Sequence, residues 1–250
     1  MRGFAASRRP FTFGFQLLPK GRNQWGAAMR TVIFDLDGTL MDTSGDLIDA
    51  ANVCFSALGL GDVLDRDRDE DRGVAVKGGK AMLRAGFARA GQFGEPEVED
   101  NYRAVLEAYG KSIDRHTTIY PGAMEAIARL AGAGYAVGIC TNKPEGLAET
   151  LLTRMGVRNT FASMIGADTL ATRKPDAEPF REAVRRAGGD PVRACLIGDT
   201  VTDLDTARAA GVPCILVDFG PGEGDVLSLS PDVVIGHHDD LFDAVEALAL

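Results

Sequence analysis

The 250-residue chain is long enough for one large domain, or for a core domain that carries an insertion. Its 45% hydrophobic and 25% charged residues are ordinary for a globular protein, and no apolar run approaches the length of a membrane span. The net charge of −9 argues against nucleic acid or an anionic membrane as the main partner. Four cysteines without a CxxC pair predict buried, reduced thiols and a cytoplasmic location.

The first 29 residues differ from the rest because they are basic and contain no acidic residue. Their charged residues are Arg2, Arg8, Arg9, Lys20 and Arg22. We expect a non-native or misassigned start here, with Met29 as the initiator. A targeting peptide and a disordered tail are the alternatives.

Four short apolar runs predict the buried strands of a parallel sheet, at residues 31–36, 135–140, 194–197 and 213–217. The segments between them have the spacing of amphipathic helices. Gly134, Gly156 and Gly211 follow these helical patterns, where a left-handed C-terminal glycine is common. Strands that alternate with helices predict an α/β fold with a doubly wound parallel sheet, and ligands bind beyond the carboxyl ends of such strands.

Residues 44–118 break this alternation, because their pattern is helical and contains no convincing strand. This segment predicts an all-helical insertion that closes over the end of the first strand, with residues 30–43 and 119–250 forming the core. Within the insertion, residues 65–72 alternate acids with arginines. Since the arginines would repel a cation, we expect a solvated loop there rather than a metal site.

Asp35 and Asp37 come at the end of the first predicted strand, and Gly38 follows them. Burying two carboxylates together is costly unless a cation shares the site. Mg²⁺ would relieve their repulsion and leave one oxygen free to attack phosphorus. A simple side-chain turn after a strand is the alternative interpretation. The three histidines, His116, His237 and His238, are assigned surface or hinge roles.

The hexapeptide Asp35–Leu40 resembles the first motif of the haloacid dehalogenase-like hydrolase superfamily, and three further motifs follow in the expected order. These motifs contain Thr141, Lys174, and Asp199 with Asp203. The resemblance covers residues 30–250. It implies a Rossmann-like core with an inserted all-α cap, and Mg²⁺ as the cofactor.

The same resemblance implies the catalytic roles. Asp35 would attack phosphorus and form an aspartyl-phosphate, while Asp37 would protonate the leaving alkoxide and then activate water. Thr141, Asn142 and Lys174 would bind the phosphate oxygens.

The metal site is implied in the same way. Mg²⁺ would be held by Asp35, the backbone carbonyl of Asp37, and Asp199. Asp203 would stand behind them and orient Lys174 or a water on the metal. The acid at position 37 favours phosphate chemistry over dehalogenation, because a halide leaving group needs no proton.

The segments 141–145, 173–176 and 231–235 resemble those of phosphoglycolate phosphatases, which predicts 2-phosphoglycolate as the substrate. In the insertion, Lys77 and Lys80 flank two glycines and would receive the substrate carboxylate. Alternatively, both lysines are solvated at the start of a helix.

Other activities share much of this pattern. They are hydrolysis of a sugar 6-phosphate such as N-acetylmuramate 6-phosphate, hydrolysis of pyrophosphate, and a phosphosugar mutase reaction. In each case the partner is a small phosphorylated metabolite, and we expect a monomer or a homodimer.

Overall fold

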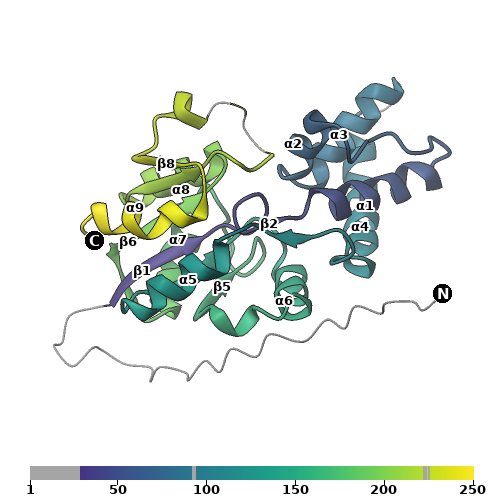
Figure 1. Cartoon of the computed structure of the whole chain (residues 1–250). Helices are drawn as coiled ribbons and strands as arrows, with labels where there is room; N and C mark the ends of the chain where they lie inside the picture. The colour runs from purple at the N-terminus through teal and green to yellow at the C-terminus, as the bar shows by residue number, and fades with distance from the viewer. Residues whose placement is uncertain (1–28, 92–93, 222–223, 225) are drawn as a thin grey trace, which may run out of the picture.

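The computed structural model describes residues 29–91, 94–221, 224 and 226–250 (Figure 1). The expectation for the basic N-terminal segment therefore lies outside the described residues, apart from Met29. Within the described ranges, no helix has both the length and the apolar character needed to cross a membrane. The cysteines at 54, 140, 195 and 214 are all free and buried, which confirms the predicted thiols.

The core of the fold is a six-stranded sheet with the order β5-β4-β1-β6-β7-β8, and every neighbouring pair is parallel. The strands are β1 (Met29–Phe34), β4 (Ala136–Cys140), β5 (Ser163–Ile165), β6 (Gly189–Gly198), β7 (Cys214–Val217) and β8 (Val233–Ile235). The four predicted strands correspond to β1, β4, β6 and β7. The strands β5 and β8 were not predicted, because three residues are too few to establish a period.

Helices cover both faces of this sheet (Figure 1). One face carries α5 (Ala123–Gly132), α6 (Glu145–Arg154) and α9 (Leu241–Ala247), and the other carries α7 (Ala177–Arg186) and α8 (Val201–Ala210). Short 3-10 turns connect them at η1 (Arg158–Thr160), η2 (Val226–Leu229) and η3 (His238–Asp240). Alternate residues of β1 pack against the two helical layers, since Val32 and Phe34 belong to one apolar cluster and Ile33 to the other. The predicted doubly wound fold is confirmed.

The predicted glycines at the helix ends adopt the left-handed conformation. The φ angles of Gly134, Gly156 and Gly211 are +86°, +75° and +73°. A side chain would strain the backbone at each of these positions.

An all-helical segment is inserted between two very short strands, β2 (Met41–Asp42) and β3 (Thr118–Ile119), which pair antiparallel. Its helices are α1 (Ser44–Ala57), α2 (Asp69–Ala75), α3 (Gly79–Ala90) and α4 (Glu95–Lys111). Figure 1 shows them gathered in a lobe beside the sheet. The predicted helical cap is confirmed, whereas the β2–β3 pair was missed because each strand has only two residues.

The interpretation of residues 65–72 as a solvated loop is wrong for their second half. The helix α2 begins within this segment, and it turns Asp71 inward so that the carboxylate is fully buried and ion-paired with Arg89. The next residue, Arg72, pairs with Asp42 at 2.7 Å. Both partners lie outside the segment, so the local pattern of charges did not reveal them.

Candidate active site

The first motif forms a tight loop at the carboxyl end of β1. The backbone N–H of Asp35 still donates to the carbonyl of Ile197 on β6, at 2.8 Å, so the sheet fixes the start of the loop. Gly38 then adopts a φ of +83°, and a Cβ atom there would lie 2.3 Å from Oδ2 of Asp199. Glycine is therefore required for the loop to pass against Asp199. Thr39 completes the contact by donating its hydroxyl to Oδ1 of Asp199 at 2.8 Å.

Three buried carboxylates meet at this edge. Oxygen atoms of Asp35, Asp199 and Asp203 all lie within 4.8 Å of one another. Oδ1 of Asp35 and Oδ2 of Asp199 are buried and have no hydrogen-bond partner among the described residues. Burial raises the pKa of Asp35 to about 6 against the opposing charge of Lys174. Burial, together with the charges of Asp203 and Asp35, also raises the pKa of Asp199 well above its usual range.

This donor set fits a hard divalent cation. Mg²⁺ prefers carboxylate and carbonyl oxygens, and its charge offsets both the desolvation and the mutual repulsion of the acids. Oδ2 of Asp199 has no partner among the described residues, and Oδ1 of Asp35 has an ion pair but no hydrogen bond there, so a cation would satisfy both atoms.

Lys174 lies behind these acids and is almost fully buried. Its Nζ donates to Oδ1 of Asp203 at 2.6 Å and lies 2.9 Å from Oδ1 of Asp35. The second contact is an ion pair without hydrogen-bond geometry. Burial by itself lowers the pKa of Lys174, but the charges of Asp203 and Asp35 outweigh it and raise the pKa. The other oxygen of Asp203 accepts from Thr200 at the start of α8, so both of its oxygens are already engaged.

Thr141 and Asn142 follow β4 and line the same cavity as Asp35. The backbone N–H of Thr141 donates to Ile165, and its hydroxyl accepts from the N–H of Lys143 at 3.2 Å. That hydroxyl keeps its own hydrogen for a ligand. The side-chain amide of Asn142 donates to the carbonyl of Lys174 at 3.1 Å. The predicted phosphate donor therefore also braces the loop that carries the lysine.

Lys143 is a site residue that the sequence analysis did not single out. Its Nζ lies 2.8 and 2.9 Å from the two carboxylate oxygens of Asp37, and it is buried beneath the ring of Tyr109 from α4. The hydroxyl of Thr43 donates to the same carboxylate at 2.7 Å. The only clue in the sequence was the position of Lys143 directly after Thr141 and Asn142.

His238 is also misplaced by the sequence analysis, which assigned it a surface or hinge role. The residue is fully buried, its Nε2 lies 2.9 Å from the carbonyl of Thr39, and its ring contacts Phe219 edge-on. Burial lowers the pKa of His238, so the neutral ring donates to that carbonyl. It thereby supports the first-motif loop at Thr39.

A cavity of about 450 Å³ connects the core motifs to the helical cap. Asp35, Asp37 and Thr141 line it from the core, and the predicted specificity residues Lys77 and Lys80 line it from the cap. Nζ of Lys80 already lies 2.7 Å from a carboxylate oxygen of Glu99. The structure thus brings both lysines to the cavity, but it shows Lys80 with an acidic partner. Asp199 and Asp203 are not in its lining.

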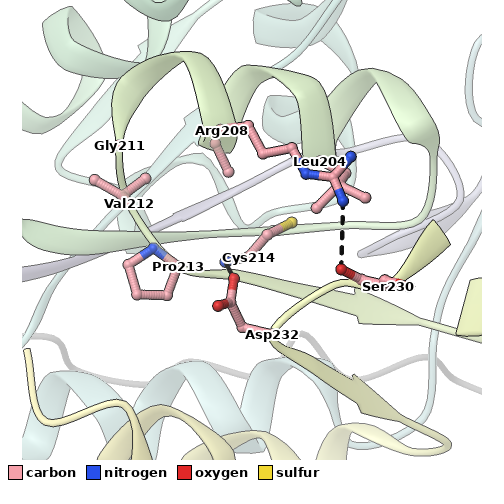
Figure 2. A pocket seen from close by; sticks show the side chains of 9 residues that line it. Leu204, Arg208, Gly211, Val212, Pro213, Cys214, Ser230 and Asp232 are labelled. Carbon is pink, nitrogen blue, oxygen red and sulfur yellow. Dashed lines mark hydrogen bonds between the residues drawn. The ribbon is translucent and has the colours of Figure 1, made fainter.

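A second cavity, of about 410 Å³, lies between the end of α8 and the start of β7 (Figure 2). Its charged side chains have partners within the protein. Arg208 donates to the carbonyls of Leu229 and Ser230, and Asp232 accepts from the backbone N–H of Cys214. These contacts hold the β7–β8 connection against α8. The charged residues that line this cavity therefore have a structural role.

Comparison with known proteins agrees with this geometry. The model of the family described as haloacid dehalogenase-like hydrolase matches residues 32–217. A phosphoglycolate phosphatase from Mesorhizobium japonicum is 41% identical over 211 residues, which cover 84% of this chain and 92% of that protein. An N-acetylmuramic acid 6-phosphate phosphatase from Pseudomonas aeruginosa is 32% identical, with coverage of 87% and 95%.

Among solved structures, CbbY from Rhodobacter sphaeroides, in complex with phosphate, superposes with a TM-score of 0.68. It is 26% identical, and the match covers 85% of this chain and 96% of that one. The family model spans most of the chain, and the first-motif loop, the buried acids and the helical cap lie within it. This chain therefore belongs to the haloacid dehalogenase-like hydrolase family.

Proposed function

We propose that this chain is a Mg²⁺-dependent phosphomonoester hydrolase that acts on 2-phosphoglycolate, with Asp35 as the nucleophile. The observation that carries the proposal is the state of Asp35. Its carboxylate is buried and ion-paired with Lys174, and the residue lines a cavity large enough for a small metabolite. A carboxylate that is desolvated and lies next to a cavity is suited to nucleophilic attack.

In the proposed reaction, an oxygen of Asp35 forms a bond to phosphorus as the ester P–O bond breaks. Lys174, 2.9 Å from that carboxylate, offsets negative charge at the reacting centre. Asp35, the carbonyl of Asp37, and Asp199 would hold Mg²⁺, which when bound supplies charge neutralisation for the carboxylates and the phosphate. The hydroxyl of Thr141 is available to donate to a phosphate oxygen.

Asp37 would act as the general acid and then as the general base. In its acid form it would give a proton to the departing alkoxide, and as a carboxylate it would then accept one from the water that attacks the aspartyl-phosphate. Phosphate leaves, and Asp35 is restored. The Lys143 ammonium and the Thr43 hydroxyl support this role, because their contacts with the carboxylate fix its position.

The assignment of 2-phosphoglycolate draws on the relatives. The phosphatase from Mesorhizobium japonicum bears that name at 41% identity and near-complete coverage. Cations from both the core and the cap line the cavity, which suits a substrate that carries a carboxylate as well as a phosphate. A sugar 6-phosphate is the second candidate, because the Pseudomonas aeruginosa relative is 32% identical and the cavity of about 450 Å³ would hold a larger ligand.

We further propose that residues 44–118 act as a cap domain on a core made of residues 30–43 and 119–250. The buried free thiols support a reducing, cytoplasmic compartment.

A substrate panel with and without Mg²⁺ tests the function. We expect release of inorganic phosphate that requires the metal, and the highest kcat/KM on 2-phosphoglycolate. An equal or higher kcat/KM on N-acetylmuramate 6-phosphate or another sugar 6-phosphate would move the assignment to the second candidate. Isomerisation of a phosphosugar without net phosphate release would reject hydrolysis.

A further inference from the structure

Six cationic side chains line the cavity next to Asp35, although the chain has a net charge of −9. They come from both sides of the cavity. The core supplies Lys143, Arg173 and Lys174, and the cap supplies Lys77, Lys80 and Arg84. An ion pair within the protein uses hydrogen-bond donors that a cationic side chain would otherwise offer to a ligand. The cation without such a partner is therefore the one most available to a ligand.

Nearly all of these cations are already engaged. In the core, Lys174 contacts Asp203 and Asp35, and Lys143 contacts Asp37. In the cap, Lys80 pairs with Glu99 and Arg84 pairs with Glu95. Lys77 likewise has an interaction within the protein.

Arg173 is the exception within the described part of the chain. Its side chain is exposed and lines the cavity, and it forms no hydrogen bond or ion pair with a described residue. Its guanidinium is therefore the one whose five N–H donors are all available to a ligand.

The backbone around Arg173 is fixed although the side chain is free. The carbonyl of Arg173 accepts from the N–H of Asp176, whose side chain in turn caps α7 through the N–H of Glu178. The carbonyl of the following residue, Lys174, accepts from the amide of Asn142. The loop thus holds Arg173 directly beside the lysine that contacts the nucleophile.

We propose that Arg173 is the specificity-determining residue that binds the second anionic group of the substrate. Lys174 and Arg173 both line the cavity, so together they suit a small molecule that carries a phosphate and a carboxylate. A guanidinium also matches a carboxylate with two parallel hydrogen bonds, which an ammonium does not. The inference rests on the proposed function, and it assigns to a core loop the role that the sequence analysis gave to Lys77 and Lys80.

Two substrates distinguish binding of the carboxylate by Arg173 from a general effect of Arg173 on activity. Ethyl phosphate has the shape of 2-phosphoglycolate with a methyl group in place of the carboxylate, so it needs the phosphate site but not Arg173. We expect Arg173→Met to lower kcat/KM for 2-phosphoglycolate by about 10- to 100-fold, mainly through KM. The same variant should change kcat/KM for ethyl phosphate by less than about 3-fold, and Arg173→Lys should recover part of the loss.

Arg103→Met is the matched control, because Arg103 is 89% exposed on α4, lies outside the cavity lining, and its loss changes the net charge equally. It should leave both substrates unaffected. Equal losses on the two substrates in Arg173→Met, or no loss on 2-phosphoglycolate, would overturn the role of Arg173. A wild-type enzyme that does not prefer 2-phosphoglycolate to ethyl phosphate would instead overturn the proposed substrate, and with it this inference.

Discussion

The two sides of the active-site cavity hold their charges in different ways. On the core side, Lys143 and Lys174 are 6% and 3% exposed, and both contact carboxylates of the candidate catalytic site. On the cap side, Lys80 and Arg84 pair with Glu99 and Glu95, and all four side chains are at least one-third exposed. The core charges are therefore desolvated, whereas the cap charges remain in contact with water.

This difference decides how much each charge depends on its partner. A buried ion that loses its partner is left uncompensated at a cost of several kcal/mol, whereas an exposed pair contributes only about 0.2–1 kcal/mol. Each of these core groups accordingly holds its partner in place. Breaking a cap ion pair to form a contact with a ligand costs little free energy. Substitutions on the two sides should therefore have effects of very different size.

The largest effect is expected for Asp35→Asn, which removes the proposed nucleophile and keeps its shape. We expect kcat to fall by about 10³-fold or more. Asp205→Asn is the control, because Asp205 is half exposed on α8 and pairs only weakly with Arg208. Phosphate release in the presence of Mg²⁺ is the measurement, and a variant that retains more than a few per cent of its activity would reject Asp35 as the nucleophile.

The same variant should not lose stability. Because the pKa of Asp35 is raised to about 6, protonated Asp35 favours the folded state at low pH, and this contribution is lost as the pH rises through about 6. At pH 7 without metal, the ionised group therefore costs free energy, and asparagine avoids that cost while Lys174 keeps Asp203 as its partner. Thermal unfolding at pH 7 without Mg²⁺ should show a Tm for Asp35→Asn that equals or exceeds that of the wild type.

Lys143→Met is expected to have the next largest effect, because Asp37 then loses the ammonium that contacts both of its oxygens. Since a positioned acid–base group contributes about 10²- to 10⁴-fold, we expect kcat on an alkyl phosphate to fall by about 10²-fold. The loss should be smaller on p-nitrophenyl phosphate, whose leaving group needs less protonation. Equal losses on both substrates, together with a lower Tm, would show that Lys143 acts only through the fold.

The sequence predicts the core of the site well, because the chemistry lies where strands end. Asp35 and Thr141 directly follow β1 and β4, and Asp199 follows β6, so parallel pairing alone brings them to one edge. Lys174 reaches the same edge from the loop before α7. The four motifs could therefore be recognised from their order, and three of them also from the strands that precede them.

The sequence predicts the partners of these residues poorly, because those partners come from distant parts of the chain. The contact of His238 with Thr39 spans 199 positions, and Lys143 reaches Asp37 across 106. Nothing local distinguishes a buried histidine from an exposed one near the C-terminus. In the cap, Asp71 is buried only because α3 supplies Arg89. Contacts of this kind follow from tertiary packing and leave no periodic pattern.

A cap substitution at Asp71 should affect stability more than activity. Asp71→Asn removes a buried carboxylate that accepts from Arg89 and from the N–H of Asp65. We expect a loss of about 1–3 kcal/mol in the free energy of unfolding, measured by denaturant titration at pH 7. Asp69→Asn in the same helix is the control, because the Asp69 side chain is fully exposed and should change stability very little.

The pH dependence gives a second test of this ion pair. The hydrogen bond from Arg89 lowers the pKa of Asp71, so its stabilisation is present above the ordinary carboxylate pKa and is lost as the pH falls through the lowered value. The stability difference between the wild type and Asp71→Asn should stay constant near neutral pH and shrink below about pH 4. A difference that does not change with pH would mean that the ionised form of Asp71 contributes nothing.

The smallest effect is expected for Lys80→Met on the cap side of the cavity. Because Lys80 is held by Glu99 and its pair is exposed, the variant should lose less than about 1 kcal/mol of stability. Its KM for 2-phosphoglycolate should rise by only about 2- to 3-fold, through the loss of one positive charge near the cavity.

Steady-state kinetics alongside Glu99→Gln give the sharpest comparison, since that change releases Lys80 from its partner. If Glu99→Gln lowers the KM for 2-phosphoglycolate severalfold and Lys80→Met raises it more than about 10-fold, then Lys80 exchanges its partner for the substrate. The cap would then share the recognition of the carboxylate with Arg173. Substrate binding would include a step in which a cap ion pair breaks while the ion pairs of the core stay in place.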